Sequence, residues 1–347
     1  MKRLIISLLA FLLVFASGCG KKTRYRAEFL SLFDTVTTIV GYSESEREFT
    51  TLAGRIKSKL TEYHRLFDIY HNYEGLNNIK TINDNAGIAP VKVDKEIISM
   101  LLFAKEQYYA TDGKTNIALG PVLAIWHEYR EKGLSDPLGA EVPPRKLLEH
   151  AARHTDIESI IITEEASTVY LSDPEMRLDA GAVAKGYAVE RIALCLEDEG
   201  ISSLLLSVGG NVRAMGGKPG QKGMEPWHIG IKNPDKESPD TELCRVLISG
   251  YSVVSSGSYE RYYNVDGIRY HHIIDPSTLS PASYFTDVTI ICRDSGIADA
   301  LSTAVFNMPL EIGKEFVEGV DGVEALWVLG TGEVIYSEGF ESFLKVD

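Results

Sequence analysis

Helix-like and strand-like hydrophobic patterns occupy separate parts of this 347-residue chain, and that separation constrains the fold most strongly. In the first half, apolar residues recur near the helical period over 51–67 and again in the run that follows Asp94. After Gly200 the patterns are mostly those of short strands, with one helix predicted at 297–308. Such a division is typical of α+β proteins, so we predict a mixed or antiparallel sheet core with flanking helices. We expect one compact unit with two lobes.

The predicted strands are short and alternate in hydrophobicity. A first pair, 159–163 and 168–172, leads into Asp179 and a helix beyond it. The later strands are predicted at 204–208, 227–231, 244–248, 253–255, 288–292, 325–329 and 333–336. A strand therefore runs into a helix at Asp179, the kind of junction at which ligands often bind.

The N-terminus reads as a targeting segment. Two basic residues precede an apolar stretch, 4–15, which is too short for an ordinary membrane span. Small residues then precede Cys19 and resemble the lipobox of bacterial lipoproteins, in which the cysteine is lipidated. We predict a signal peptide at 1–18, a lipidated tether at 19–28 and a folded domain at 29–347. Ordinary secretion with cleavage near the same place is the alternative, and either reading puts the domain on the extracytoplasmic side of the membrane.

Composition and net charge limit the kinds of partner that the chain can bind. The chain is 44% hydrophobic and 24% charged, as globular proteins are, and carries a formal net charge of -14, which argues against binding a nucleic-acid backbone. A single dinucleotide needs only local positive groups. The cysteines other than Cys19 are Cys195, Cys244 and Cys292, with no Cys-x-x-Cys pair and no His at zinc spacing. We therefore predict no disulfide framework, and expect each of the three to be a small buried hydrophobe.

The run 179–186, Asp-Ala-Gly-Ala-Val-Ala-Lys-Gly, places an acid, a base and two glycines at the mouth of a predicted helix. Gly181 allows close backbone approach, the amides at a helix start are donors, and Lys185 adds a positive charge. This combination suits a phosphate group. A purely structural role for the run is the alternative.

A second run, 298–303, places Asp299 and Thr303 at i and i+4 of a predicted helix, hence on one face. A carboxylate and a hydroxyl are hard oxygen ligands of the kind that Mg²⁺ takes. The alternative is that Asp299 caps a helix and Thr303 has no special role. Phosphate and Mg²⁺ together suggest a nucleotide.

These two runs, together with three further motifs in a fixed order, resemble the ApbE family of flavin transferases, also called FAD:protein FMN transferases. The further motifs are Phe33-Asp34-Thr35, the stretch 207–211 (Ser-Val-Gly-Gly-Asn) and the stretch 272–276 (His-Ile-Ile-Asp-Pro). The resemblance extends from about Phe29 to the C-terminus. It implies an enzyme that transfers the FMN half of FAD to a Ser or Thr hydroxyl of another, extracytoplasmic redox protein. AMP would leave, Mg²⁺ would assist, and FAD would lie in the cleft between two lobes.

The resemblance also implies roles for individual residues. It assigns the metal shell to Asp299, Thr303 and the main-chain carbonyl of Ala182. It assigns FAD contacts to Phe33, Tyr70, Thr115, Asn116, Asp179, Lys185 and Ile273. Phe33 and Tyr70 would lie against the flavin or adenine rings, with ordinary core packing as the alternative. Thr115 and Asn116 fall where many members carry Phe-Asp-Pro, so the chemistry of that contact is expected to differ.

His271 and His272 are adjacent in a strand-like segment, so their side chains point to opposite faces and only one can reach a site. An imidazole that titrates near neutrality is a sensible base for a hydroxyl, and the family pattern selects His272. An FAD contact or a structural role is the alternative for His272. Asp275 could orient it or hold the following turn, in which Leu279 stands where family members often have glycine.

Two other functions fit the same residues. With water in place of the acceptor hydroxyl, the site would be an FAD pyrophosphatase that yields FMN and AMP. Without catalysis, the chain would be an FAD-binding lipoprotein, although a cation poised on the pyrophosphate argues for chemistry.

Overall fold

The computed structural model describes residues 22–33 and 35–345, with Asp34 outside the description. The predicted signal peptide, the lipidation at Cys19 and the central residue of the Phe33-Asp34-Thr35 motif lie outside the described residues, so these remain predictions. Within the described part of the chain, no helix has the length and apolar character needed to cross a bilayer.

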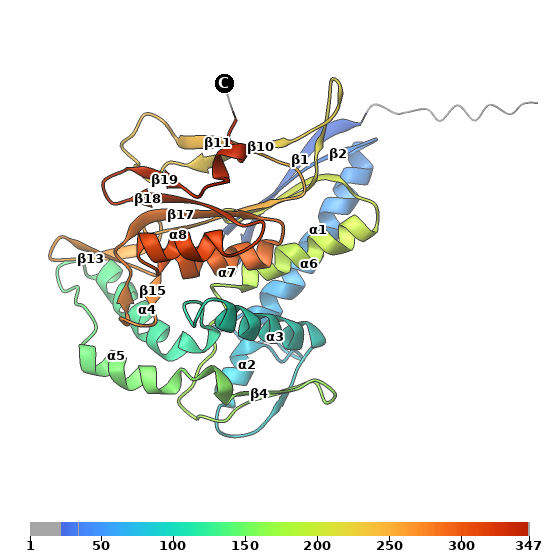
Figure 1. Ribbon diagram of the computed structural model, residues 1–347. Helices are drawn as coiled ribbons and strands as arrows, with labels where there is room; N and C mark the ends of the chain where they lie inside the picture. Colours follow the sequence, from blue (N-terminus) through green and yellow to red (C-terminus); the bar gives the residue numbers. More distant parts are fainter. Residues whose placement is uncertain (1–21, 34, 346–347) are drawn as a thin grey trace, which may run out of the picture.

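One eight-stranded sheet forms the centre of the upper lobe (Figure 1), and every pair of neighbouring strands in it is antiparallel. This confirms the α+β prediction and selects the antiparallel alternative. In spatial order the strands are β1 (Thr23–Leu32), β2 (Thr35–Ser43), β6 (Ser203–Val208), β7 (Asn211–Gly216), β12 (Ser252–Gly257), β17 (Phe285–Cys292), β18 (Glu324–Leu329) and β19 (Val334–Tyr336).

The first strand corrects the predicted domain boundary. Residues 23–28 were assigned to a tether, but they belong to β1 and pair with β2 from Thr23 opposite Ser43 onward. The stretch is polar because β1 is the edge strand of the sheet and most of its side chains are exposed or half-buried. Polarity alone therefore did not distinguish an edge strand from a linker.

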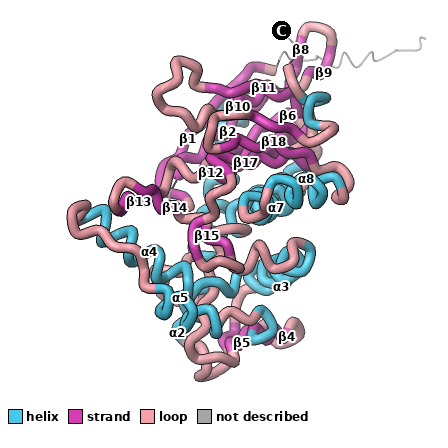
Figure 2. Tube along the Cα trace, turned by 60° about the vertical axis from the view of Figure 1, so that its left-hand side comes forward, coloured by secondary structure: helices cyan, strands magenta, loops and turns pink. Residues whose placement is uncertain are grey.

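The two faces of the sheet are covered by different elements. Alternate residues of the central strands point to opposite faces, so Val253 and Ile291 pack under the hairpin of β10 (Trp227–Lys232) and β11 (Glu242–Ile248). Val254 and Ile290 pack on the other face, where α7 (Ser295–Phe306) and α8 (Leu310–Glu318) lie. Figure 2 shows the hairpin and these two helices on opposite sides of the sheet.

A second lobe, mostly helical, lies below the sheet in Figure 1. The largest hydrophobic cluster joins the two lobes, because α1 (Glu46–Phe67) and α6 (Ala184–Asp198) contribute to it together with β2 and β6. The second lobe and the smaller hairpins comprise α2 (Ile79–Asp84), β3 (Val91–Lys92), α3 (Lys95–Ala110), η1 (Ile117–Leu119), α4 (Gly120–Ser135), α5 (Arg145–Ala151), η2 (Ala152–His154), η3 (Ile157–Ser159), β4 (Ile160–Thr163), β5 (Thr168–Leu171), β8 (Lys218–Gly220), β9 (Gly223–Glu225), β13 (Tyr262–Val265), β14 (Ile268–His271), β15 (Ile274–Asp275), β16 (Ser280–Pro281) and, at the C-terminus, η4 (Phe340–Phe343).

The strongly periodic segments fold as predicted. The first predicted helix is α1, which begins at Glu46 because the Ser45 hydroxyl accepts a hydrogen bond from the Glu48 amide and caps it. Asp94 caps α3 in the same way through the Glu96 amide. The helix α4 was not predicted because its apolar residues form no clear stripe, although Val122 and Trp126 are buried in a cluster with Tyr263.

Candidate functional site

A cleft of about 1090 Å³ is lined by residues of both lobes. Its walls include the strand ends of the sheet, the start of α6, one face of α7 and part of α4. The volume exceeds the roughly 300–1,000 Å³ of pockets that hold drug-sized molecules, so the cleft has room for a dinucleotide. The predicted site residues that line it are Phe33, Tyr70, Asn116, Asp179, Ala182, Lys185, His272, Ile273, Asp299 and Thr303.

Asp299 lies where α6 and α7 meet. Its carboxylate is only 4% exposed; Oδ2 accepts a hydrogen bond of 2.8 Å from the Gly186 amide, and Oδ1 lies 3.3 Å from Lys185 Nζ. Val183, the N-cap residue of α6, makes no side-chain cap, so Asp299 satisfies an amide of the first turn from outside the helix. The capping alternative is thus partly right: Asp299 caps α6 and not its own helix, which Asp294 caps.

The amides at the mouth of α6 differ from the prediction, which treated them as free donors. The helix begins at Ala184, and the Gly181 amide donates to Asp179 Oδ1. The amides of Val183 and Ala184 donate to the Ala180 carbonyl. Because these donors are engaged, attraction for a phosphate at this mouth rests mainly on the charge of Lys185.

Gly186 lets the two helices approach closely. A Cβ at this position would lie 2.3 Å from the Ser295 carbonyl oxygen and 2.4 Å from Asp299 Cβ, both well inside contact distance. The two adjacent residues Lys185 and Gly186 therefore have separate roles. Lys185 provides charge, and Gly186 provides the room that brings the Asp299 carboxylate against α6.

Asn211, the last residue of the motif at 207–211, is held inside the fold. The positive φ values belong to Gly209 and Gly210, and Asn211 is the buried first residue of β7. Its Oδ1 accepts a hydrogen bond from the Ser295 hydroxyl. Asn211 thereby ties the sheet to the start of α7.

The oxygen groups assigned to a metal fit a hard divalent cation. Thr303 lies one turn after Asp299 on α7, and Ala182 lies just before α6 on the same cleft wall. A carboxylate, a hydroxyl and a peptide carbonyl form an all-oxygen set, which Mg²⁺ prefers over nitrogen or sulfur ligands. Lys185 already neutralises part of the Asp299 charge, as a cation at the same place would.

Asp179 lies half-buried on the cleft wall, and desolvation raises the pKa of its carboxyl despite the hydrogen bond from Gly181. A carboxyl with a raised pKa holds a proton more readily and can donate a hydrogen bond. Its backbone amide donates to the Ile117 carbonyl, so the segment before α6 is fixed to the second lobe.

The two adjacent histidines have different surroundings. His271 is buried: its Nε2 lies 2.7 Å from the Ala282 carbonyl oxygen and its Nδ1 accepts from the Ile273 amide, so both ring nitrogens are used. His272 keeps solvent contact within the cleft, while its backbone amide donates to the Arg261 carbonyl. Desolvation by the cleft walls and the charge of Arg261 lower the pKa of His272, which keeps the imidazole neutral at neutral pH.

Asp275 holds the turn that follows it. It is buried, and its Oδ1 accepts from Lys114 Nζ at 2.9 Å and from the Ser277 amide at 3.0 Å. Leu279 has a φ of 59°, in the left-handed region that favours glycine, so glycine would adopt this backbone conformation with less strain. Burial of the Leu279 side chain beside Trp126, whose Nε1 donates to the Leu279 carbonyl, offsets that strain.

Aromatic and basic side chains line the cleft near the two residues assigned to ring contacts. Phe33 lies edge-on to His64, and Tyr70 lies 5.6 Å from the His127 ring between centroids. Arg130 Nη2 is 2.8 Å from His127 Nδ1, which adds positive charge to this wall. His127 and Arg130 were not among the predicted site residues because they belong to α4, a helix without a recognisable sequence pattern.

Thr115 and Asn116 have structural partners. Thr115 does not line the cleft: it is buried, and its hydroxyl donates to the Ala300 carbonyl of α7 at 2.7 Å. Asn116 lines the cleft, but its side chain caps η1 through the Ala118 amide and donates to the Thr155 carbonyl. Thr115 therefore makes a structural contact between the second lobe and α7 instead of lining the cleft.

The ApbE family model matches residues 33–327, which span both lobes and every residue of the cleft discussed above. The chain belongs to the ApbE family. ApbE relatives named "FAD:protein FMN transferase" include proteins of Klebsiella pneumoniae (32% identical, covering 79% of this chain and 84% of the relative) and Treponema pallidum (34% identical, 77% and 75%). The chain is thus a member of an enzyme family whose curated relatives are named as transferases.

Solved ApbE structures have the same fold. The ApbE protein of Thermotoga maritima superposes with a TM-score of 0.80 at 31% identity, covering 93% of this chain and all of that protein. The flavin transferase ApbE of Vibrio cholerae superposes with a TM-score of 0.76 at 23% identity, over 93% of this chain and 100% of that one, and supports the fold alone.

Proposed function

We propose that this protein is a Mg²⁺-dependent flavin transferase that moves FMN from FAD to a Ser or Thr hydroxyl of an acceptor protein and releases AMP. The observation that carries the proposal is the meeting of Lys185, Asp299 and His272 in one cleft large enough for a dinucleotide. Family membership and the names of the relatives support the same reaction.

In this reaction the acceptor hydroxyl oxygen attacks the phosphorus of the FMN half, and the bond from that phosphorus to the bridging pyrophosphate oxygen breaks. AMP leaves with the bonding electron pair. His272, neutral because its pKa is lowered, accepts the proton of the hydroxyl. Lys185 attracts the pyrophosphate. Asp299, Thr303 and the Ala182 carbonyl would hold Mg²⁺, which supplies neutralisation of charge on the pyrophosphate when bound.

Comparison with His271 supports His272 as the residue that accepts the proton. Both nitrogens of His271 are engaged by backbone groups, so it cannot take up a proton without losing a hydrogen bond. Both histidines line the cleft, contrary to the prediction that only one could reach it, and the lowered pKa of His272 keeps its imidazole neutral. The proton of an acceptor hydroxyl therefore has one suitable recipient among this pair.

The N-terminal pattern supports a location at the outer face of the cell membrane, with a lipid on Cys19. Since β1 begins at Thr23, residues 19–22 would form the whole tether, a reach of at most about 14 Å. The domain would then work close to the membrane surface and act on acceptors held there. A Cys19→Ser variant that still incorporates labelled fatty acid would contradict the anchor.

The reaction is tested by incubating the protein with FAD, Mg²⁺ and a flavoprotein acceptor, and reading the acceptor mass and the nucleotides together. A mass gain equal to FMN, with AMP released and both effects lost on chelation, supports the transferase. FMN and AMP without a mass gain would indicate the pyrophosphatase. Intact FAD in a stable complex would indicate a flavin-binding lipoprotein.

A further inference from the structure

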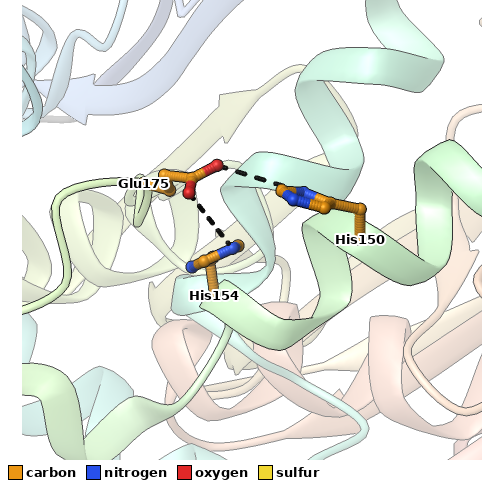
Figure 3. Close-up of side chains that lie close together, drawn as sticks. All are labelled: His150, His154 and Glu175. Carbon is orange, nitrogen blue, oxygen red and sulfur yellow. Dashed lines mark ion pairs between the residues drawn. The ribbon is translucent and has the colours of Figure 1, made fainter.

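A second cluster of chemically active side chains lies outside the cleft, on the helical lobe. His150 is in α5 and His154 ends η2, while Glu175 belongs to the loop after β5. Figure 3 shows the Glu175 carboxylate facing both imidazoles, with an ion pair drawn to each. One ligand atom from each of the three residues lies within 4.8 Å of the other two, and none of the three lines the cleft.

Asp173 fixes the orientation of one imidazole. Its Oδ2 lies 2.8 Å from His154 Nδ1, and because a carboxylate only accepts, that nitrogen carries the hydrogen. In the neutral ring the lone pair is then on Nε2, which lies 3.6 Å from Glu175 Oε1. A carboxylate that orients a histidine from behind is the usual outer partner of a metal-binding histidine.

The distances match ligands around an ion better than direct contacts. His150 Nδ1 is 3.9 Å from Glu175 Oε2, and the His154 Nε2 contact is 3.6 Å, whereas hydrogen bonds of this type are at most about 3.2 Å. Ligands placed about 2.1 Å from a tetrahedral ion are about 3.4 Å apart. The three ligand atoms, which all lie within 4.8 Å of one another, would close to that spacing around an ion.

The loop that carries Glu175 is held in place. The Glu175 amide donates to Asp173 Oδ1 at 2.9 Å, and the next residue, Met176, is 1% exposed. Pro174 packs so closely on Gly87 that a Cβ there would lie 2.5 Å from Pro174 Cβ. The ligand set therefore joins a helix end and a loop whose backbone is held in place.

We propose that His150, His154 and Glu175 bind a late divalent transition-metal ion of the Zn²⁺ class. Two imidazole nitrogens and one carboxylate oxygen suit Zn²⁺, whereas Mg²⁺ favours the all-oxygen set of the cleft. Both His150 and Glu175 face solvent, which leaves the fourth position to water. The prediction of no His at zinc spacing is therefore wrong: His150 and His154 are separated by three residues, which is a zinc spacing, and the third ligand is remote from them in sequence.

An ion at this site would cross-link two segments of the second lobe. One is the α5–η2 helix end; the other is the loop that continues through Leu178 to Asp179 at the mouth of α6. Asn83 already anchors Leu178, because its side chain donates to the Leu178 carbonyl and accepts from the Leu178 amide. The bound ion would stabilise the same loop from its other end.

The test is a calorimetric titration of the full chain with Zn²⁺ in excess Mg²⁺, which occupies the oxygen site. We expect one equivalent of Zn²⁺ to bind, with affinity reduced at least tenfold in His150→Ala and roughly 10–100-fold in Asp173→Asn. His228→Ala, a histidine on β10 outside the cluster, is the matched control and should bind as the wild type does. Equal affinity in the wild type and a His150→Ala/His154→Ala double variant would overturn the proposal.

A spectroscopic measurement separates loss of the site from loss of the fold. Co²⁺ in place of Zn²⁺ should give visible bands of a four-coordinate ion in the wild type. Glu175→Gln keeps the side-chain shape but weakens the third ligand, so these bands should diminish while the circular dichroism spectrum stays unchanged. Bands that persist unaltered in both Glu175→Gln and His150→Ala would place the ion elsewhere and contradict the assignment.

Discussion

The Asp299 carboxylate of α7 accepts a 2.8 Å hydrogen bond from the backbone amide of Gly186 in α6. This single contact caps one helix, joins two helices and fixes the carboxylate on the cleft wall. A residue that would hold Mg²⁺ is thereby kept rigid by the fold itself, so its geometry does not depend on the ligand.

We expect Asp299→Asn to fold but to lose at least about a hundredfold in the rate of AMP release at saturating FAD. The amide can still accept from Gly186, whereas the charge that would attract the cation is gone. Melting temperature and AMP release are the measurements. Full activity in a folded variant would remove Asp299 from the metal site.

Gly186→Ala should lower stability by about 1–3 kcal/mol and lower activity as well, because the new methyl group meets the Ser295 carbonyl at 2.3 Å. Denaturant unfolding and AMP release check both effects. Gly54→Ala in α1 is the matched control: nothing lies within 4 Å of its Cβ, and alanine is the better helix former by up to about 1 kcal/mol. A Gly186→Ala protein as stable as Gly54→Ala would show that the helices can move apart freely.

His272→Ala should leave FAD affinity within a few fold and slow transfer by roughly 10²–10⁴-fold, the usual contribution of a general base. Equilibrium FAD binding and single-turnover transfer separate the two effects. Transfer at the wild-type rate would exclude His272 from the proton transfer.

The pH dependence tests the same residue. Because the pKa of His272 is lowered from its ordinary value of 6.5, the imidazole stays neutral as the pH falls from 8 to 6. Transfer measured across that range should therefore show no loss with a midpoint near 6.5. His271→Ala provides the contrast: it should lower the melting temperature, because two buried hydrogen bonds are lost, without the same defect in a folded, FAD-bound enzyme.

Asp287 should make stability fall as the pH rises. It is buried in β17, and desolvation raises the pKa of its carboxyl from 3.8 to about 7, so the folded state binds the proton more tightly than the unfolded state. The free energy of unfolding then decreases between about pH 4 and 7. Asp287→Asn removes this dependence and should stabilise the protein at pH 8 by about 2–4 kcal/mol. Urea unfolding at pH 5 and pH 8 measures the free energy of unfolding of both proteins. An Asp287→Asn variant that is less stable than the wild type at pH 8 would contradict the predicted direction of the effect.

Periodic hydrophobic patterns predicted those elements whose buried face is a clear stripe. In α1, Ile56 and Leu60 are nearly inaccessible and recur at the helical spacing, and the start of α3 follows a capping aspartate. Cys195 shows the limit of this reasoning. It belongs to the amphipathic helix α6 as predicted, but the prediction of burial is wrong because the residue is on the exposed side.

Hydrogen-bond partners that are remote in sequence could not be predicted. The Gly186 amide donates to Asp299, which is 113 positions away in the chain. From the sequence alone, that amide was therefore expected to be available to a phosphate. Likewise, the hydroxyl of Thr115 reaches a carbonyl 185 residues away and turns from the cleft. The identity of the cleft residues was accessible through motifs, whereas their competing intramolecular bonds required the structure.

The central claim is that FMN passes from FAD to a hydroxyl of another protein. Tandem mass spectrometry of a flavoprotein acceptor, after incubation with this protein, FAD and Mg²⁺, tests it most directly. We predict FMN attached through phosphate to one Ser or Thr of the acceptor, and none when Asp299→Asn replaces the wild type. An acceptor without FMN, in a reaction that consumes FAD, would contradict the claim.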